Sequence, residues 1–129
     1  MAVTCTEIAA LGADLLTQGT EVADRSGVSR LYYGALHRAR EWIKTTPGTA
    51  NSGGYTTTHA KLQHELRHLS GLADAAQHKK GRKLEVKLAT LKKRRTEADY
   101  ELGSQLLTPS EVAAQKAETD IFFSYCDQP

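Results

Sequence analysis

Apolar residues recur at intervals of three and four along most of this sequence, and this spacing constrains the fold more than any other feature. The clearest run is Leu84, Leu88, Leu91, Ala98 and Leu102. Residues at such intervals share one face of an α-helix. No extended alternation of apolar and polar residues indicates a strand, and no Asn-Gly pair indicates a hairpin. The sequence therefore predicts an all-α fold, an antiparallel bundle of about five helices.

Turn-forming and capping residues divide the chain into the predicted helices. We expect them over about residues 4–18, 24–46, 58–77, a long fourth stretch after a basic connection at 79–82, and 109–125. Asp24 or Ser26 caps the second helix. Thr108, Pro109 and Glu111 match the N-cap, first-turn proline and capping-box glutamate of the fifth. Residues 47–57, rich in Gly, Ser and Thr, predict a loop.

The same spacing predicts which face of each helix meets the core. The expected lines are Ile8, Leu11 and Leu15 in the first helix; Val28, Tyr32, Ala35, Ala39 and Ile43 in the second; Leu62, Leu66, Leu69, Ala73 and Ala76 in the third; and Val112, Ala113, Ala117 and Ile121 along the fifth.

Length and composition favour one globular domain over residues 1–129. A chain of this length can bury a single core. With 40% hydrophobic and 25% charged residues, its composition is globular, not disordered. No apolar run approaches the roughly 20 residues that cross a bilayer, and the N-terminus lacks a basic segment followed by a hydrophobic one. We therefore expect a cytoplasmic protein with no membrane contact. Cys5 and Cys126, far apart in the sequence, are expected to be reduced thiols.

Charge is distributed unevenly. Residues 1–24 contain acidic side chains and no Lys or Arg, whereas residues 79–95 are strongly basic. A basic block on one helix is typical of a phosphate-binding face, but it is equally typical of a solvated helix balanced by acidic neighbours. The candidate nucleic-acid-binding residues are Lys87, Lys92, Lys93 and Arg94, together with Arg38.

Arg95 interrupts the apolar line of the fourth helix at a position where the spacing calls for leucine. A guanidinium there must be paired, open onto a cleft or extend from the edge of the stripe into solvent, because a buried unpaired charge is costly. Asp99 lies one turn further on, and Tyr100 follows it. The functional interpretation is an arginine held in a groove to bind phosphate.

The second helix offers a polar face that matches such a groove. Arg30, Tyr33, His37 and Lys44 share one side of it. Arg30 and His37 stand two turns apart, roughly 10 Å along the axis, so they can bracket one ligand. The other interpretation is an ordinary polar helix face that carries a histidine.

Two motifs in this order resemble the small HEPN proteins of prokaryotes. Residues 29–39, SRLYYGALHRA, are similar to the family's S-R-x-Y-Y-x-x-x-H-x-A helix. Residues 95–100, RTEADY, are similar to its R-x-x-A-D-Y segment. A closing helix opened by residues 108–111 completes the order, so the likeness covers residues 24–123.

The resemblance implies a helical domain that pairs with itself, often encoded beside a small nucleotidyltransferase in toxin–antitoxin or defence systems. Active members cut RNA without metal, using an Arg followed four to six residues later by His, brought together across a dimer. Imidazole can move the 2′-hydroxyl proton while arginine stabilises charge on the phosphate. The candidate catalytic residues are Arg95, Asp99 and Tyr100 of the matching segment, together with Arg30 and His37, which have six residues between them but lie on the second helix and not where the family's catalytic pair sits.

The chain departs from that pattern downstream of Arg95, where Asp99 and Tyr100 stand and no histidine follows. Both an active ribonuclease and a non-cutting module therefore remain open. In some family pairs the nucleotidyltransferase modifies a tyrosine near the site, and Tyr100 is the matching position.

A competing motif lies in the predicted third helix. Residues 64–68, HELRH, have the H-E-x-x-H spacing with which two histidines grip Zn²⁺ from one helix face. Glu65 would serve as the base and Asp74 as a third ligand beside His64 and His68. Proteases with this motif also have a β-sheet and a Met-containing turn, and Met1 is the only methionine here. A zinc hydrolase is therefore kept as an alternative to the metal-independent site.

Overall fold

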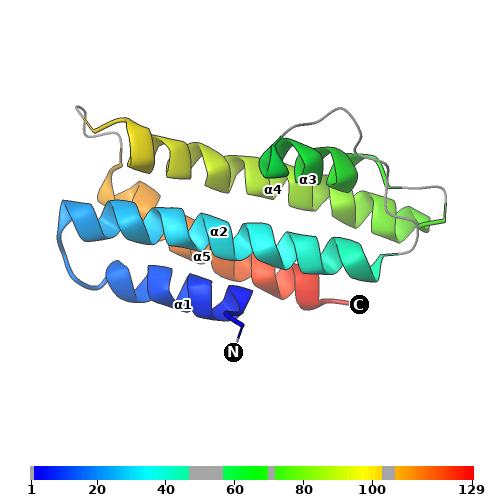
Figure 1. Cartoon of the computed structure of the whole chain (residues 1–129), viewed down its shortest axis with the longest axis horizontal. Coiled ribbons are helices and arrows are strands. Elements are labelled where there is room, and N and C mark those ends of the chain that lie inside the picture. The colour runs from blue at the N-terminus through cyan, green and yellow to red at the C-terminus, as the bar shows by residue number, and fades with distance from the viewer. Residues whose placement is uncertain (1, 47–56, 70–71, 103–106) are drawn as a thin grey trace.

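The computed structural model describes residues 2–46, 57–69, 72–102 and 107–129, which form five helices (Figure 1). These are α1 (Cys5–Leu15), α2 (Glu21–Thr45), α3 (Thr58–Arg67), α4 (Ala75–Tyr100) and α5 (Pro109–Asp127). Within these ranges there is no strand, so the expected all-α bundle is confirmed. No helix in the described part of the chain combines the length and apolarity needed to span a membrane. Most of the loop expected at 47–57 lies outside the described residues.

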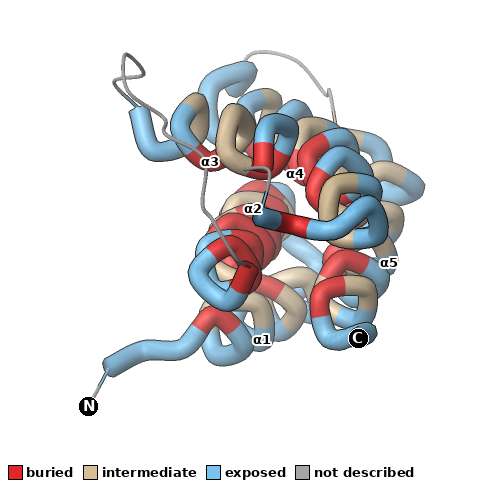
Figure 2. The backbone as a smooth tube through the Cα atoms, turned by 90° about the vertical axis from the view of Figure 1, so that its right-hand side faces the viewer, coloured by how far each residue is buried: buried red, intermediate tan, exposed pale blue. Residues whose placement is uncertain are grey.

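Helix α2 is the centre of the bundle and packs against all four other helices (Figure 2). Its expected inward line from Val28 to Ile43 is buried, which confirms that prediction. Leu84, Leu88 and Leu91 of α4 are also buried and join the same core cluster. Two faces with the periodicity of a helix therefore meet as the sequence indicates.

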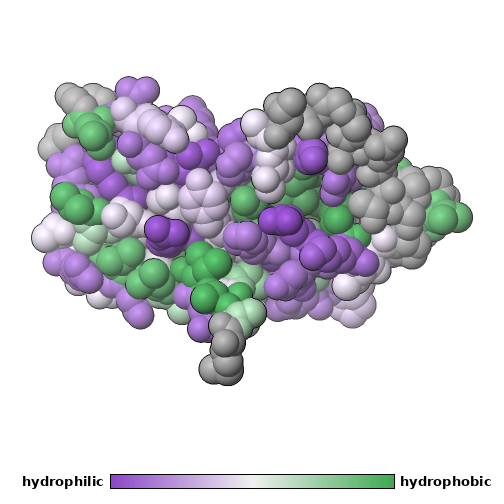
Figure 3. Space-filling model, in the orientation of Figure 1, coloured by the Kyte–Doolittle hydropathy of each residue, from purple (hydrophilic) through white to green (hydrophobic). Residues whose placement is uncertain are grey.

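Helix α1 meets α2 through small residues, and of the expected line of Ile8, Leu11 and Leu15 the first and last are half-buried while Leu11 is wrong. A Cβ added to Gly12 would lie 2.9 Å from the carbonyl oxygen of Gly27, so only glycine permits this approach. Cys5 and Gly12 are the buried residues of α1, whereas Leu11 is 50% exposed. Leu11 consequently faces outward, and Figure 3 shows apolar surface along the lower edge of the molecule, over α1.

The boundary between α3 and α4 differs from the expected helix over 58–77. Helix α3 ends at Arg67, and Asp74 opens α4 with a capping box. The Asp74 carboxylate accepts a hydrogen bond from the Gln77 amide at 2.8 Å, and Gln77 Oε1 accepts one from the Asp74 amide at 2.9 Å. These local bonds favour a new helix start over continuation of the Leu and Ala pattern. The basic connection expected at 79–82 therefore lies inside α4.

Polar side chains line the contact of α5 with the core. Gln115, Thr119, Phe122 and Cys126 are its buried residues. Gln115 Nε2 donates to the carbonyl oxygens of Val28 and Leu91 at 3.2 and 3.1 Å, which ties α5 to both α2 and α4. The apolar line from Val112 to Ile121 does not face the core, because the face of α5 that contains Gln115 and Thr119 is the one that packs there.

Arg25 of α2 holds the C-terminal end of α4. Its guanidinium donates to the carbonyl oxygens of Glu97, Ala98 and Glu101 at 3.2, 2.9 and 3.2 Å. These carbonyls belong to the last turn of α4, where a cation also interacts favourably with the helix dipole. Leu102 lies just beyond this turn and is exposed, contrary to its expected place in the core line.

Candidate functional site

Arg95 is buried in the bundle, where the apolar spacing puts it. Only 7% of the residue is exposed, and its neighbours on the α4 stripe, Leu91 and Ala98, are buried too. The alternative in which Arg95 extends from the stripe edge into solvent is therefore wrong. The remaining question is what surrounds its charge.

Three tyrosine rings surround the Arg95 guanidinium. Its Cζ atom lies 5.4 Å from the ring centre of Tyr32, 5.7 Å from that of Tyr33 and 5.9 Å from that of Tyr100. Tyr32 and Tyr33 come from α2, and Tyr100 is the last residue of α4. Aromatic faces attract a cation and keep water away from it. The site is thus a cationic group in an aromatic box.

The aromatic box does not satisfy the hydrogen-bonding capacity of Arg95. Its Nε is buried and, among the described residues, is the one buried side-chain nitrogen or oxygen without a hydrogen-bond partner. The Asp99 carboxylate lies 3.5 Å from Nη1, too far for a good hydrogen bond, and it accepts a hydrogen bond from Ser29 Oγ at 3.2 Å. A planar guanidinium that lacks a close acceptor is suited to bind an oxyanion such as phosphate.

His59 of α3 also lies against Tyr32 and Tyr33. Its Nδ1 is 2.6 Å from the hydroxyl oxygen of Tyr32. Its ring lies 5.6 Å from the Tyr32 ring and 6.1 Å from the Tyr33 ring. Arg95 contacts the same two rings, so the imidazole and the guanidinium share one aromatic wall. Sequence reasoning did not select His59.

Local electrostatics set the protonation of His59 and Tyr32. Burial, followed by the charges of Lys92 and Arg95, lowers the pKa of His59, so its imidazole is neutral at pH 7. Burial raises the pKa of Tyr32 far above its usual value, against the opposing charge of Arg95. The phenol therefore stays protonated, and Tyr32 holds the imidazole through Nδ1 while Nε2 remains for another partner.

The signal for His59 was present in the sequence. His59, Leu62 and Leu66 follow intervals of three and four, so the histidine extends the buried leucine line of α3. Arg95 occupies the same kind of position in α4. Two polar residues within the apolar lines of neighbouring helices are therefore the sequence pattern that indicates this site.

Of the other candidate catalytic residues, Asp99 and Tyr100 lie beside Arg95, but Arg30 and His37 are not brought to it. In the described part of the chain, no hydrogen bond, ion pair or ring contact links either residue to the guanidinium. Arg30 is exposed. His37 lines a separate hollow with Cys5 and Ile8 of α1, because α1 packs along that side of α2.

The candidate nucleic-acid-binding residues do not form one face. Arg38 pairs with Asp127 at 2.9 Å. Arg94 binds Glu118 and Gln115 of α5, so acidic neighbours balance both arginines. Lys92 influences His59, Lys93 is exposed, and Lys87 lines a groove between α4 and α5.

The alternative zinc site lacks a third ligand. The rings of His64 and His68 lie 4.7 Å apart and line one hollow, but Glu65 lines a different one. The Asp74 carboxylate caps α4 instead of facing the two histidines. The described ranges contain no group of three His, Cys, Asp or Glu side chains placed to hold a metal ion. The H-E-x-x-H spacing therefore does not form a three-ligand zinc centre.

Comparison with known proteins assigns no family or function to the chain, because it matches no protein-family model, no curated protein sequence and no solved structure.

Proposed function

We propose that the protein binds RNA at the Arg95 site and cleaves it without a metal ion. The observation that carries the proposal is a buried guanidinium whose Nε has no hydrogen-bond acceptor among the described residues and whose ion pair with Asp99 is long, at 3.5 Å. Leaving such a group unpaired destabilises the fold, and a phosphate oxygen would supply the missing acceptor. The HEPN resemblance adds the expectation of a homodimer acting in a toxin–antitoxin or defence system.

In this proposal the chemistry is transfer of a phosphodiester to the neighbouring 2′-oxygen. Arg95 holds the phosphate and stabilises the charge that builds on its oxygens. Neutral His59 accepts the 2′-hydroxyl proton at Nε2, in the tautomer whose Nδ1–H donates to Tyr32. The 2′-oxygen attacks phosphorus, the bond to the 5′-oxygen breaks, and that oxygen takes up a proton from water, while His59 releases the proton that it accepted to solvent. The products are a 2′,3′-cyclic phosphate and a 5′-hydroxyl end.

Several described residues support RNA as the ligand. Unpaired bases stack on tyrosine rings, and Tyr100, 71% exposed at the end of α4, offers such a face beside Arg95. Lys92 adds positive charge close to His59. The aromatic wall and the cations therefore suit single-stranded RNA.

Cleavage of labelled RNA in EDTA tests this proposal, with a matched pair of histidine variants. His59→Gln is expected to lower the cleavage rate about 100-fold or more, because it removes the base. His37→Gln, a half-buried histidine of α2 outside the site, should cleave like the unmodified protein. Equal activity of the two variants, or loss only in His37→Gln, would contradict the assignment, as would a protein that cleaves no RNA.

A second candidate function follows from the exposure of Tyr100. A phenol that projects into solvent beside Arg95 and Asp99 is placed to accept a nucleotidyl group from a partner enzyme. The protein would then be a non-catalytic module whose site is modified by a nucleotidyltransferase, with pyrophosphate released. Co-expression with a nucleotidyltransferase from the adjacent gene should add the nucleotidyl mass to the intact protein, and Tyr100→Phe should remove that addition. An unchanged mass for the unmodified sequence would rule this out.

A further inference from the structure

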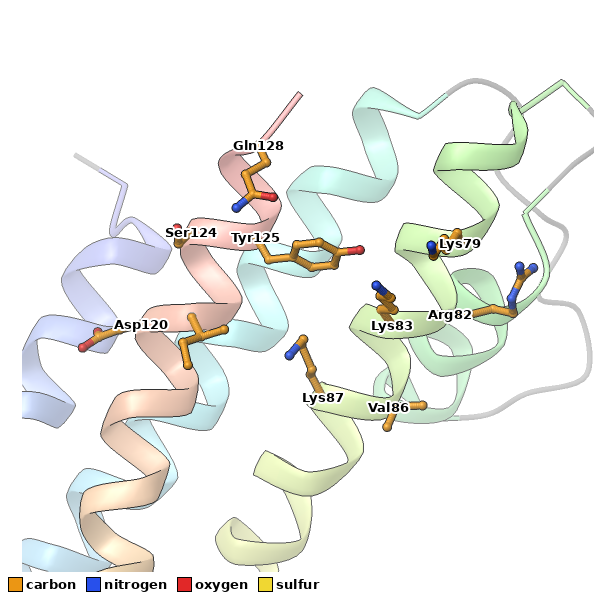
Figure 4. A pocket seen from close by; sticks show the side chains of 10 residues that line it. Lys79, Arg82, Lys83, Val86, Lys87, Asp120, Ser124, Tyr125 and Gln128 are labelled. Carbon is orange, nitrogen blue, oxygen red and sulfur yellow. The ribbon is translucent and has the colours of Figure 1, made fainter.

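A groove runs between the first half of α4 and the last half of α5, away from the Arg95 site (Figure 4). Its volume is about 820 Å³. The lining residues of α4 span Lys79 to Lys87, and the others span Asp120 of α5 to Gln128, its C-cap. Each set covers about two helical turns. The groove is therefore as long as a short segment of a third helix.

Three of the lining residues, Val86, Ile121 and Tyr125, have apolar side chains, and we call them the floor of the groove. Val86 of α4 is 62% exposed and Ile121 of α5 is 54% exposed, and the half-buried ring of Tyr125 lies between the two helices. Ile121 faces outward because α5 uses its Gln115, Thr119 and Phe122 side to meet the core. Exposed aliphatic side chains within a groove are typical of a surface that another protein covers.

The rim of the groove is cationic. Lys79, Arg82, Lys83 and Lys87 line it from α4. None of the four takes part in an ion pair with the described residues. The one carboxylate in the lining, Asp120, pairs with Lys116 of its own helix at 2.5 Å. The groove therefore offers four cations with no acidic partner among the described side chains.

We propose that this groove docks an acidic amphipathic helix of a partner protein. Apolar side chains of such a helix would cover Val86, Ile121 and Tyr125, while its glutamates and aspartates pair with the four cations of the rim. Packing of a helix between two others is a common mode of recognition, and complementary charge adds specificity. The aliphatic floor favours this occupant over RNA, whose phosphates need cations but make little use of exposed Val and Ile side chains.

The test uses the intact chain and a fluorescent helical peptide of about 16 residues, with glutamates on one face and leucines on the other. A peptide of the same composition, scrambled so that the leucines share no face, is the control ligand. Val86→Asp and Ile121→Asp place a carboxylate on the floor without disturbing the core. Lys83→Glu reverses a rim charge, and Lys93→Glu makes the same change at an exposed position of α4 outside the groove.

We expect the amphipathic peptide to bind, measured by fluorescence anisotropy, and the scrambled peptide to bind at least about tenfold more weakly. Val86→Asp, Ile121→Asp and Lys83→Glu should each weaken binding about tenfold or more, and Lys93→Glu less than twofold, roughly. Equal binding of the two peptides, or full affinity in Val86→Asp and Ile121→Asp, would overturn the proposal. So would single-stranded RNA that displaces the peptide and loses affinity in the same variants, since the groove would then be a nucleic-acid site.

Discussion

Replacing Arg95 with methionine is expected to stabilise the fold and to abolish the RNA binding that we propose for this site. Methionine keeps much of the length and volume of the arginine stem but brings no charge and no N–H group. The change therefore removes a buried Nε that lacks an acceptor among the described residues. Replacement of a buried ion pair by apolar side chains of similar size is often neutral or stabilising, and here the remaining partner, Asp99, is partly exposed and is solvated when the guanidinium is removed.

The magnitude follows from the contacts of the guanidinium. Removing the unpaired nitrogen should stabilise by about 1–3 kcal/mol. Against this stand the tyrosine contacts, about 1–2 kcal/mol, and the long ion pair with half-exposed Asp99, about 0–1 kcal/mol. Contacts between the methionine sulfur and the tyrosine rings should stabilise the fold by about 0.5–1 kcal/mol. The net expectation is a gain of about 1 kcal/mol in the free energy of unfolding.

Urea denaturation followed by circular dichroism measures this difference, and a gain of that size should raise the melting temperature by about 3–4 °C. Arg95→Lys is the control, because it keeps a charge but lacks the planar fork that binds phosphate in two places. It is expected to lose stability and to bind RNA poorly. A methionine variant that is less stable by more than about 1 kcal/mol would refute the reasoning, since the guanidinium would then be stabilised by contacts that the site does not show.

Three further outcomes follow from the structure. Gly81→Ala should destabilise by about 1–2 kcal/mol in urea, despite the better helix propensity of alanine, because its Cβ would lie 2.5 Å from the Leu66 carbonyl oxygen. Arg25→Met should cost about 2 kcal/mol in the same assay, because the Ala98 and Glu101 carbonyls lose the guanidinium as donor, while the Glu97 carbonyl keeps its bond from the Glu101 amide. The lowered pKa of His59 means that the unfolded chain binds more protons below about pH 6.5, so stability falls as the pH drops through that value. His59→Gln should flatten the stability profile between about pH 7 and pH 5.

The parts of the fold that could be predicted are those in which burial follows the helical period. The lines through Val28 and Ile43 in α2 and through Leu84 and Leu91 in α4 are buried as expected. Aliphatic side chains at those intervals share one helix face, and that face packs in the core. The inner faces of α1 and α5 were missed for opposite reasons. Gly12 is buried for its small size, and Gln115 is buried with hydrogen bonds that only the folded chain provides.

The candidate site likewise contains residues that helical spacing predicts and one residue that it does not. Arg95, Asp99 and Tyr100 lie within two turns of one helix, so local spacing was sufficient to group them. His59 belongs to a helix that is remote in sequence, and its approach depends on how α3 packs against α4 and α2. The segments around His37 and around His64 and His68 match the spacing of known sites more closely than the segment around His59 does, so the pattern alone favours them.

Helix α3 has ten residues, and this short length affects how the protein responds to heat. Helices shorter than about 12–15 residues are marginal on their own, so α3 persists only through its tertiary contacts. Partial opening of this segment would carry the imidazole away from the guanidinium while α2 and α4 remain folded. Amide hydrogens of α3 should then exchange sooner than those of α2, and a nucleotide that bridges Arg95 and His59 should slow their exchange.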